Sequence, residues 1–368
     1  MKITMAHGSG GRATTDLIAG IFAKHLGNQI LDKMEDSAVI PGAATIAMTT
    51  DSFVVTPLFF PGGDIGKLAV CGTVNDLCMS GAIPKYLTCG FILEEGALIA
   101  EIEQIVLSMA KAAREAGVII VAGDTKVIEG KGGIYINTTG VGFMPANALE
   151  YNNEPAIRAS NCKDGDVIIL SGYIGDHHAA ILSSRMNIKN TIKSDCAPLC
   201  GITKALKESG VKIKAMRDVT RGGLATVLNE FATASQCGIT IDEINIPVSG
   251  QVRAFSKILG LDPLYMANEG KMIAVVDRKD AQKVLGCMHD SPYGRNATII
   301  GAITQGCKDP ESQGDGGVGT LTTPPSPWNK DDAVAKTVDW KPTVILNTTI
   351  GGVRIIPELY GEGLPRIC

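Results

Sequence analysis

The chain has 368 residues, of which 45% are hydrophobic and 20% charged, and its net charge is −4. This composition indicates a folded protein of two domains and excludes a disordered chain. A nearly balanced charge provides no attraction to nucleic acid or anionic membranes, so we expect neither as a partner. The N-terminus lacks a signal-peptide pattern and no apolar run approaches the ~18 residues of a membrane span, so we expect a cytoplasmic protein.

The first 26 residues combine a glycine-rich turn with a helix. Gly8, Ser9, Gly10 and Gly11 precede an apolar pattern of helical spacing over Arg12–Leu26. Free backbone N–H groups at such a turn suit a phosphate, although a flexible N-terminal arm is the more common outcome of such a sequence.

A strand is expected over Thr45–Val55, with Asp51 at its centre, and a helix over Asp64–Ser80. Lys67 and Asp76 on this helix are nine residues apart and point to opposite faces. They therefore cannot line one pocket on one side of the helix. Either one of them is simply solvated, or a site would draw on two chains.

The remainder of the first half is predicted to form a strand, a helix and two further strands, in that order. We expect strands over Lys85–Leu93 and Ile134–Phe143 and an amphipathic helix over Leu98–Gly117. A short buried strand, Val118–Ala122, is expected to end at Gly123-Asp124-Thr125-Lys126. The polar stretch 145–164 indicates a boundary between domains 1–150 and 151–350.

The second half alternates strands and helices. Strands are expected over Val167–Leu170, Ile213–Met216, Thr343–Leu346 and Gly352–Ile356, and a helix over Leu224–Ser235. Residues 305–341 are rich in Gly, Pro and Asp and are interpreted as a surface insertion. Their G-x-G-x-x-G at 314–319 has no strand before it and no helix after it, so it does not predict a dinucleotide site.

Acidic residues recur near the ends of expected elements. Asp124, Asp176 and Asp218 follow apolar strands, and Asp51 and Asp76 add two more. A single acid at such a place is usually a cap or turn residue. Five of them suit Mg²⁺, which takes one or two carboxylates with phosphates completing its shell. The chain has no Walker A sequence, so an ATP site would be built from dispersed aspartates.

The tail 351–368 ends in Cys368, after Gly361, Gly363 and Pro365. It could be a frayed terminus, or it could carry its thiol into another site. The ten cysteines show no metal-binding spacing, and most are expected to be buried thiols.

Several motifs taken together resemble the HypE family of hydrogenase maturation proteins. This family belongs to the ATP-binding superfamily of aminoimidazole ribonucleotide synthetase, selenophosphate synthetase and thiamine-phosphate kinase. The resemblance covers nearly the whole chain except 305–341. It rests on His7–Gly11, Asp51–Val55, Phe59–Leu77, Gly123–Lys126, Arg217–Leu224, Ala267–Lys271 and Leu364–Cys368.

The resemblance implies an α+β fold with two domains. The N-terminal sheet would pair with that of a second copy, forming a β-barrel in a homodimer, and the C-terminal domain would be α/β. ATP and Mg²⁺ would be the cofactors, with Asp51, Asp76, Asp124 and Asp218 as metal ligands. The implied cofactor-binding set is Gly8, Ser9, Gly10, Gly11, Asp51, Lys67, Asn75, Asp76, Asp124, Asp218 and Thr220.

The resemblance also implies a reaction on the tail itself. A HypF-type carbamoyltransferase would load a carboxamide onto Cys368, and ATP-dependent dehydration would leave a thiocyanate. The cyano group would pass to a HypC–HypD scaffold as a ligand for the iron of [NiFe] hydrogenase. Lys126 and Glu269 would sit beside the thiocarboxamide, one orienting its oxygen and the other accepting its proton.

Two other functions remain open at this point. A sibling enzyme such as selenophosphate synthetase would use a reactive Cys or selenocysteine and a Lys in the N-terminal loop. Residues 1–15 contain no Cys and only Lys2. A non-catalytic carrier would fit the tail but would leave the aspartates without a purpose. His178 and Val219 depart from the Gly and Pro expected by the resemblance.

Overall fold

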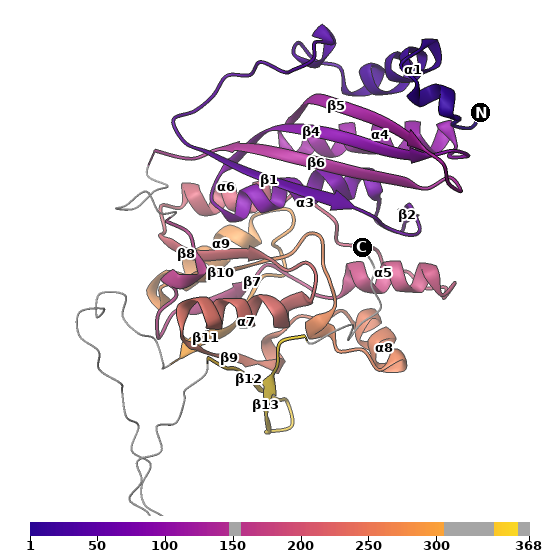
Figure 1. The fold of residues 1–368 in the computed structure, drawn as a ribbon. Coiled ribbons are helices and arrows are strands. Elements are labelled where there is room, and N and C mark those ends of the chain that lie inside the picture. The colour runs from indigo at the N-terminus through magenta and orange to yellow at the C-terminus, as the bar shows by residue number, and fades with distance from the viewer. Residues whose placement is uncertain (147–155, 305–341, 360–368) are drawn as a thin grey trace, which may run out of the picture.

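The computed structural model describes residues 1–146, 156–304 and 342–359 (Figure 1). The predicted domain boundary at 150, the predicted insertion 305–341 and the end of the tail with Cys368 lie outside the described residues. The described chain forms two large sheets, one in each half of the sequence, and a small two-stranded sheet in the first half.

The N-terminal sheet has four strands in the order β1-β6-β4-β5. Burial alternates along β1 and β6, as expected when only one face of a sheet is covered. Neighbouring strands are antiparallel except for β4 and β5, which are parallel. The bounds are β1 (Ile46–Phe53), β4 (Ile83–Glu94), β5 (Ile119–Ile128) and β6 (Ile134–Phe143). The short strands β2 (Phe59–Phe60) and β3 (Gly63–Asp64) form a separate hairpin.

Two helices cover one face of this sheet, α3 (Ile65–Met79) and α4 (Ile99–Ala116) (Figure 1). The carboxylate of Asp64 caps α3 by accepting two backbone N–H groups of its first turn. Helix α4 ends at Gly117, whose φ of 71° is a conformation that glycine adopts easily. The predicted N-terminal helix is present as a continuous run with a π-helical centre: α1 (Arg12–Leu17), η2 (Ile18–Ala23) and α2 (Lys24–Leu26), flanked by the 3₁₀ turns η1 (Met5–Gly8) and η3 (Leu31–Lys33).

The predicted end of the third strand at Ala122 is wrong, because β5 continues to Ile128. Parallel pairing with β4 extends β5 beyond Ala122, because Gly90 pairs with Asp124 and Ile92 pairs with Lys126. Residues paired across a ladder share a face of the sheet. Asp124 and Lys126 therefore lie within the strand, on the face opposite to the helices.

The C-terminal sheet has seven strands in the order β13-β12-β9-β11-β7-β10-β8. Among these strands only β12 and β9 are parallel. The expected α/β domain has the predicted mixture of helices and strands, but it lacks the parallel sheet that this class implies. The bounds are β7 (Val167–Leu170), β8 (Ile213–Asp218), β9 (Gly238–Asp242), β10 (Met272–Val276), β11 (Thr298–Thr304), β12 (Val344–Asn347) and β13 (Val353–Ile356).

Helices cover both faces of this second sheet. Helix α7 (Gly223–Ser235) contacts β9 and β12, and α9 (Ala281–His289) contacts β7 and β11. All five residues of β10 are consequently buried. The other helical elements are η5 (Ala159–Asn161), α5 (Asp176–Arg185), α6 (Cys200–Glu208), η6 (Glu243–Asn245), α8 (Gly250–Leu259), η7 (Pro263–Tyr265) and η8 (Arg278–Asp280). No helix in the described part of the chain is long and apolar enough to span a membrane.

Helix α3 joins the two halves, because it contacts β1 and β6 on one side and β8 and α6 on the other (Figure 1). One hydrophobic core runs through it, from Val70 and Val74 to Ile169 and Ala274 of the second sheet. The segment 194–199 packs in this junction and leads into α6.

Asn75 fastens α3 to this segment. Its Oδ1 accepts the backbone N–H of Leu199 at 2.8 Å, and its Nδ2 donates to the carbonyl of Ala197 at 3.1 Å. The side chain is buried, with 2% of its surface exposed. A buried amide whose donor and acceptor are both paired is costly to remove, because its backbone partners lose their hydrogen bonds.

We expect Asn75→Ala to lower the free energy of unfolding by about 2–4 kcal/mol, since two buried backbone groups would be left unpaired. Urea denaturation followed by circular dichroism measures this. The matched control is Asn190→Ala, which removes an exposed amide whose hydrogen bonds stay within its own loop. Equal losses in the two variants would contradict the fastening role of Asn75.

Candidate functional site

A cavity of about 220 Å³ lies where the two halves meet. Four carboxylates from four different segments line it: Asp51 of β1, Asp76 of α3, Asp218 at the end of β8 and Glu269 before β10. The other polar residues of its lining are Thr50, Ser52, Thr220 and Arg221, and Phe53, Leu68 and Gly72 also line it. Five of the predicted site residues are therefore brought together within one chain.

Close packing of α3 against β1 brings the first two carboxylates together. The Thr49 hydroxyl of β1 donates to Asp76 Oδ2 at 2.9 Å. Gly72 faces Phe53 and Asp51, and a Cβ there would lie 2.9 Å from the Phe53 ring and 3.5 Å from Asp51 Oδ2. Glycine at this position permits the close approach of helix and strand.

Burial dominates the electrostatics of the cavity. Desolvation raises the pKa of Asp51 and of Asp76, and it raises that of Asp218 to about 7. The neighbouring charge of Asp76 raises the pKa of both Asp51 and Asp218 further. Carboxylates that destabilise one another's charge favour a bound cation. Burial raises the pKa of Asp51 and of Asp76 more than the positive charge of Arg221 lowers it.

The pKa of Glu269 is raised as well. Burial is the main cause that raises its pKa well above the usual range, followed by Cys196 and Asp218. A carboxyl group kept protonated near neutral pH can donate a proton, and it becomes a base when a cation approaches.

The carboxylates do not form a closed cage for a metal. Within the described residues, no three His, Cys, Asp or Glu side chains lie close enough together to hold one ion. This arrangement fits Mg²⁺, which is commonly held by one or two carboxylates together with water and substrate phosphates. Asp51, Asp76 and Asp218 are the residues that could hold it.

A second group of predicted residues lies at the opposite edge of the N-terminal sheet. The Gly8–Gly11 turn lies against β5. Gly8 packs so closely on Val127 of this strand that a Cβ on Gly8 would be 2.8 Å from Val127 Cβ. Asp124 and Lys126 are on the open face of the same strand. Two strands separate β5 from β1, so Asp124 is about 14 Å from Asp51 across the sheet. Within one chain, the structure does not bring these residues to the cavity.

Lys67 and Asn75 lie apart from both groups. Lys67 Nζ donates to the carbonyl of Gly62 at 3.2 Å, whereas Asp76 faces β1. The two residues thus point in different directions, as their spacing predicted. Asn75 uses its amide to hold 197–199 and not to line the cavity. Cys368, the predicted reactive residue, lies outside the described residues.

Sequence reasoning missed two residues at this junction. Arg221 belongs to the same Arg217–Leu224 motif as Asp218 and Thr220, so its position in the motif could have indicated it. Asp195 has no such signal, because it lies in a segment without helix or strand. Its carboxylate accepts the backbone N–H groups of Glu269 and Gly270.

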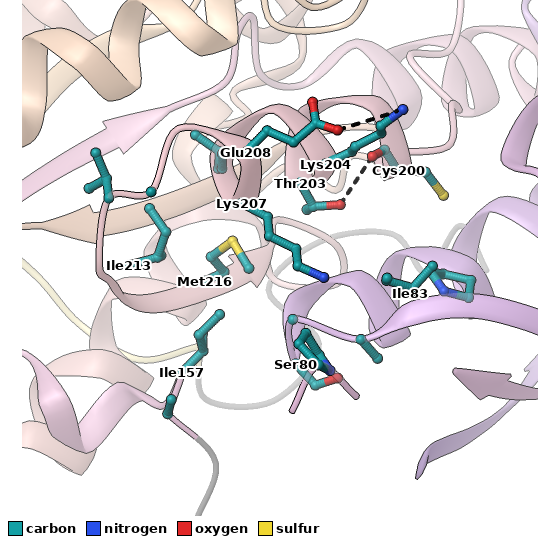
Figure 2. A pocket seen from close by; sticks show the side chains of 18 of the residues that line it. Ser80, Ile83, Ile157, Cys200, Thr203, Lys204, Lys207, Glu208, Ile213 and Met216 are labelled. Carbon is teal, nitrogen blue, oxygen red and sulfur yellow. Dashed lines mark hydrogen bonds and ion pairs between the residues drawn. The ribbon is translucent and has the colours of Figure 1, made fainter. Parts of the chain in front are cut away.

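A larger cavity of about 980 Å³ lies between the edge of the N-terminal domain and α6. Figure 2 shows its lining, with Ile83, Ile157, Ile213 and Met216 around Lys207. Among the described residues that line it, the one acidic residue is Glu208, whose carboxylate is 3.8 Å from Lys204 Nζ. The described lining of this cavity contains no cluster of carboxylates, so we assign the chemistry to the smaller cavity.

Comparison with known proteins agrees with this architecture. The N-terminal domain of AIR synthase related proteins matches residues 34–144, and the C-terminal domain of the same family matches residues 163–310. The carbamoyl dehydratase HypE of Cupriavidus necator is 43% identical over 373 residues, covering 100% of this chain and 95% of that protein. The chain belongs to the HypE family.

Solved HypE structures share the fold. A HypE crystallised in complex with ATP is 42% identical, with a TM-score of 0.84 and coverage of 99% of both chains. HypE in a HypE–HypF complex is 41% identical, with a TM-score of 0.71, covering 93% of this chain and 99% of that one. HypE proteins are carbamoyl dehydratases of hydrogenase maturation, and ATP and HypF are bound by these relatives.

The raised pKa of Asp218 gives a testable dependence of stability on pH. Its pKa rises from the ordinary 3.8 to about 7 on folding, so the charged form costs stability above pH 7. Without divalent cations, we expect Asp218→Asn to raise the free energy of unfolding by about 1–3 kcal/mol near pH 8. This gain should shrink as the pH falls through 7 and vanish near the ordinary pKa, where Asp218 is protonated in both states.

Denaturation of both proteins in chelator at several pH values measures this difference. The control is Asp16→Asn, which removes an exposed carboxylate of α1. A gain for Asp218→Asn that does not change between pH 8 and pH 4 would contradict the assignment.

Proposed function

We propose that the chain uses ATP to dehydrate a carbamoyl group carried on its own Cys368, leaving a thiocyanate. The observation that carries the proposal is the cavity in which Asp51, Asp76, Asp218 and Glu269 meet. Membership of the HypE family supports the same reaction, since its curated members are named carbamoyl dehydratases.

The reaction needs an activated oxygen. The amide oxygen of the S-carbamoyl group attacks the γ-phosphorus of ATP, which releases ADP and gives an O-phosphorylated imidate. One of the two nitrogen-bound protons leaves as this imidate forms. Loss of phosphate and of the remaining nitrogen-bound proton then forms the C≡N bond. The overall change converts the thiocarboxamide and ATP to the thiocyanate, ADP and phosphate. Phosphorylation is required because an unmodified amide oxygen is a poor leaving group.

The residues of the cavity fit this sequence of events. Asp51, Asp76 and Asp218 would hold Mg²⁺, which would neutralise charge on the transferred phosphoryl group. Thr220 and Arg221 lie beside them to contact phosphate oxygens. Glu269 is the candidate base for the nitrogen-bound proton once a positive charge lowers its pKa.

A homodimer would complete the site. The open face of the N-terminal sheet exposes six large apolar side chains, among them Met48, which is 64% exposed; the others are Ile46, Ile83, Ile92, Ile119 and Ile128. An uncovered apolar sheet face marks an interface. Pairing two such sheets into a barrel would cover it.

The same pairing would explain why the predicted residues form two groups. The edge strands of the sheet are β1 and β5. Pairing β1 of one chain with β5 of the other would place Asp51 near Asp124, Lys126 and the Gly8–Gly11 turn of the partner. Lys126 would then be the positive charge that faces Glu269.

The proposed partners follow from the same chemistry. A HypF-type carbamoyltransferase would load Cys368, as the HypE–HypF complex of a relative indicates. A HypC–HypD scaffold would accept the cyano group as a ligand for the iron of [NiFe] hydrogenase. A sibling enzyme acting on a free small molecule would use a reactive Cys or selenocysteine and a Lys in the N-terminal glycine loop, whereas residues 1–15 contain no Cys and their one Lys, Lys2, lies before the loop.

The central prediction concerns the mass of the C-terminal peptide. We expect carbamoylated protein incubated with Mg-ATP to lose the mass of one water at Cys368, with one ADP and one phosphate formed per event. Intact-mass and peptide mass spectrometry measure this. Cys368→Ala should keep nucleotide affinity within about twofold but abolish dehydration, because only the carrier atom is removed. ATP turnover on a small substrate with an unchanged tail would favour the sibling enzyme.

A second prediction tests the shared site. Asp51→Ala and Asp124→Ala should each be inactive as homodimers. Mixing them after reversible dissociation should restore about a quarter of the wild-type activity, because about half of the dimers are mixed and each has one intact site. Asp51→Ala mixed with Asp76→Ala is the control and should stay inactive, since both residues lie in one chain's group. Recovery in neither mixture would contradict the shared site.

A further inference from the structure

Asp195 holds the backbone turn that carries Glu269. Its Oδ1 accepts the N–H of Glu269 at 3.0 Å and its Oδ2 accepts the N–H of Gly270 at 3.2 Å. Lys271 Nζ lies 3.4 Å from the same Oδ2. The Asp195 side chain is 4% exposed and that of Lys271 is 11% exposed, so the ion pair is buried.

The turn is fixed from its other side as well. The carbonyl of Glu269 accepts the backbone N–H of Ala197 at 3.2 Å. A Cβ on Gly270 would lie 2.0 Å from the carbonyl oxygen of Asp195, so glycine is needed for this approach. The peptide groups on both sides of Glu269 are thus held by segment 195–197, while its carboxyl group reaches the cavity.

We propose that Asp195 is a positioning residue for Glu269, fixing the direction from which its carboxyl group meets the reacting group. The proposal rests on the proposed function, because it assigns Glu269 to the proton transfer. A proton acceptor must be held close to its productive geometry, and a displacement of about 1 Å costs up to about 100-fold in rate. Asp195 does not line the cavity, whereas Glu269 does, so Asp195 would act on the reaction through Glu269.

The C-terminal domain contains a matched ion pair that is remote from Glu269. Asp166 bonds to Lys214 and its side chain is also 4% exposed, while that of Lys214 is 12% exposed. Lys214 also pairs with Asp277. Loss of either buried acid should destabilise the protein, because its basic partner loses a buried counter-charge. Only the loss of Asp195 should change the position of Glu269.

The test compares Asp195→Asn with Asp166→Asn in the full-length dimer. Three quantities are measured: hydrogen exchange of the Glu269 and Gly270 amides, affinity for Mg-ATP, and single-turnover dehydration of carbamoylated Cys368. We expect Asp195→Asn to speed exchange of the two amides and slow dehydration by at least about tenfold, with nucleotide affinity within about threefold. Asp166→Asn should lower stability but change neither exchange at 269–270 nor the dehydration rate by more than about twofold.

Faster exchange with an unchanged dehydration rate would overturn the proposal, and so would equal slowing in both variants. If Asp195→Asn does not fold, Asp195→Glu replaces it, because the longer side chain keeps the negative charge beside Lys271 but moves the two acceptor oxygens. Amide exchange at 269–270 and a dehydration rate that both equal those of Asp166→Asn would then overturn the proposal. If the wild type hydrolyses ATP without dehydrating Cys368, the proposed function fails. The positioning proposal is then judged by amide exchange together with the rate of phosphate release.

Discussion

The structure depends on keeping four carboxyl groups in one poorly hydrated cavity. Burial raises the pKa of each of them, and the charge of a neighbouring carboxylate raises the pKa of Asp51, Asp218 and Glu269 further. Such a cluster destabilises the folded protein until a cation or a proton reduces its charge. The protein therefore carries a cost at this place that its remaining contacts must offset, which is characteristic of a functional site.

The offsetting contacts come from the junction itself. Helix α3 is buried between the two sheets and its apolar side chains belong to one core with both. Asn75, next to Asp76, binds the helix to segment 194–199 through Leu199. Asp195 of the same segment binds the turn that carries Glu269. Carboxylates from opposite domains are thus held by a short chain of hydrogen bonds. A small shift of segment 194–199 would therefore move carboxyl groups in the cavity.

Local patterns predicted much of this arrangement. Apolar periodicity located α3 and α4, and Asp218 was found because it ends an apolar strand before a glycine turn. The position of Asp124 could not be predicted, because Gly and Asp are weak strand formers and only the distant ladder with β4 extends β5 past them. The antiparallel second sheet and the role of Asp195 are also set by contacts between remote segments, which no local pattern encodes.

The proposed reaction requires that the metal and the nucleotide bind in this cavity. The most direct test is the anomalous scattering of Mn²⁺ in crystals grown with a non-hydrolysable ATP analogue. The account predicts an Mn²⁺ peak within about 2.5 Å of a carboxylate oxygen of Asp51, Asp76 or Asp218, with the triphosphate beside it. A well-occupied nucleotide whose metal contacts none of these three residues would contradict it.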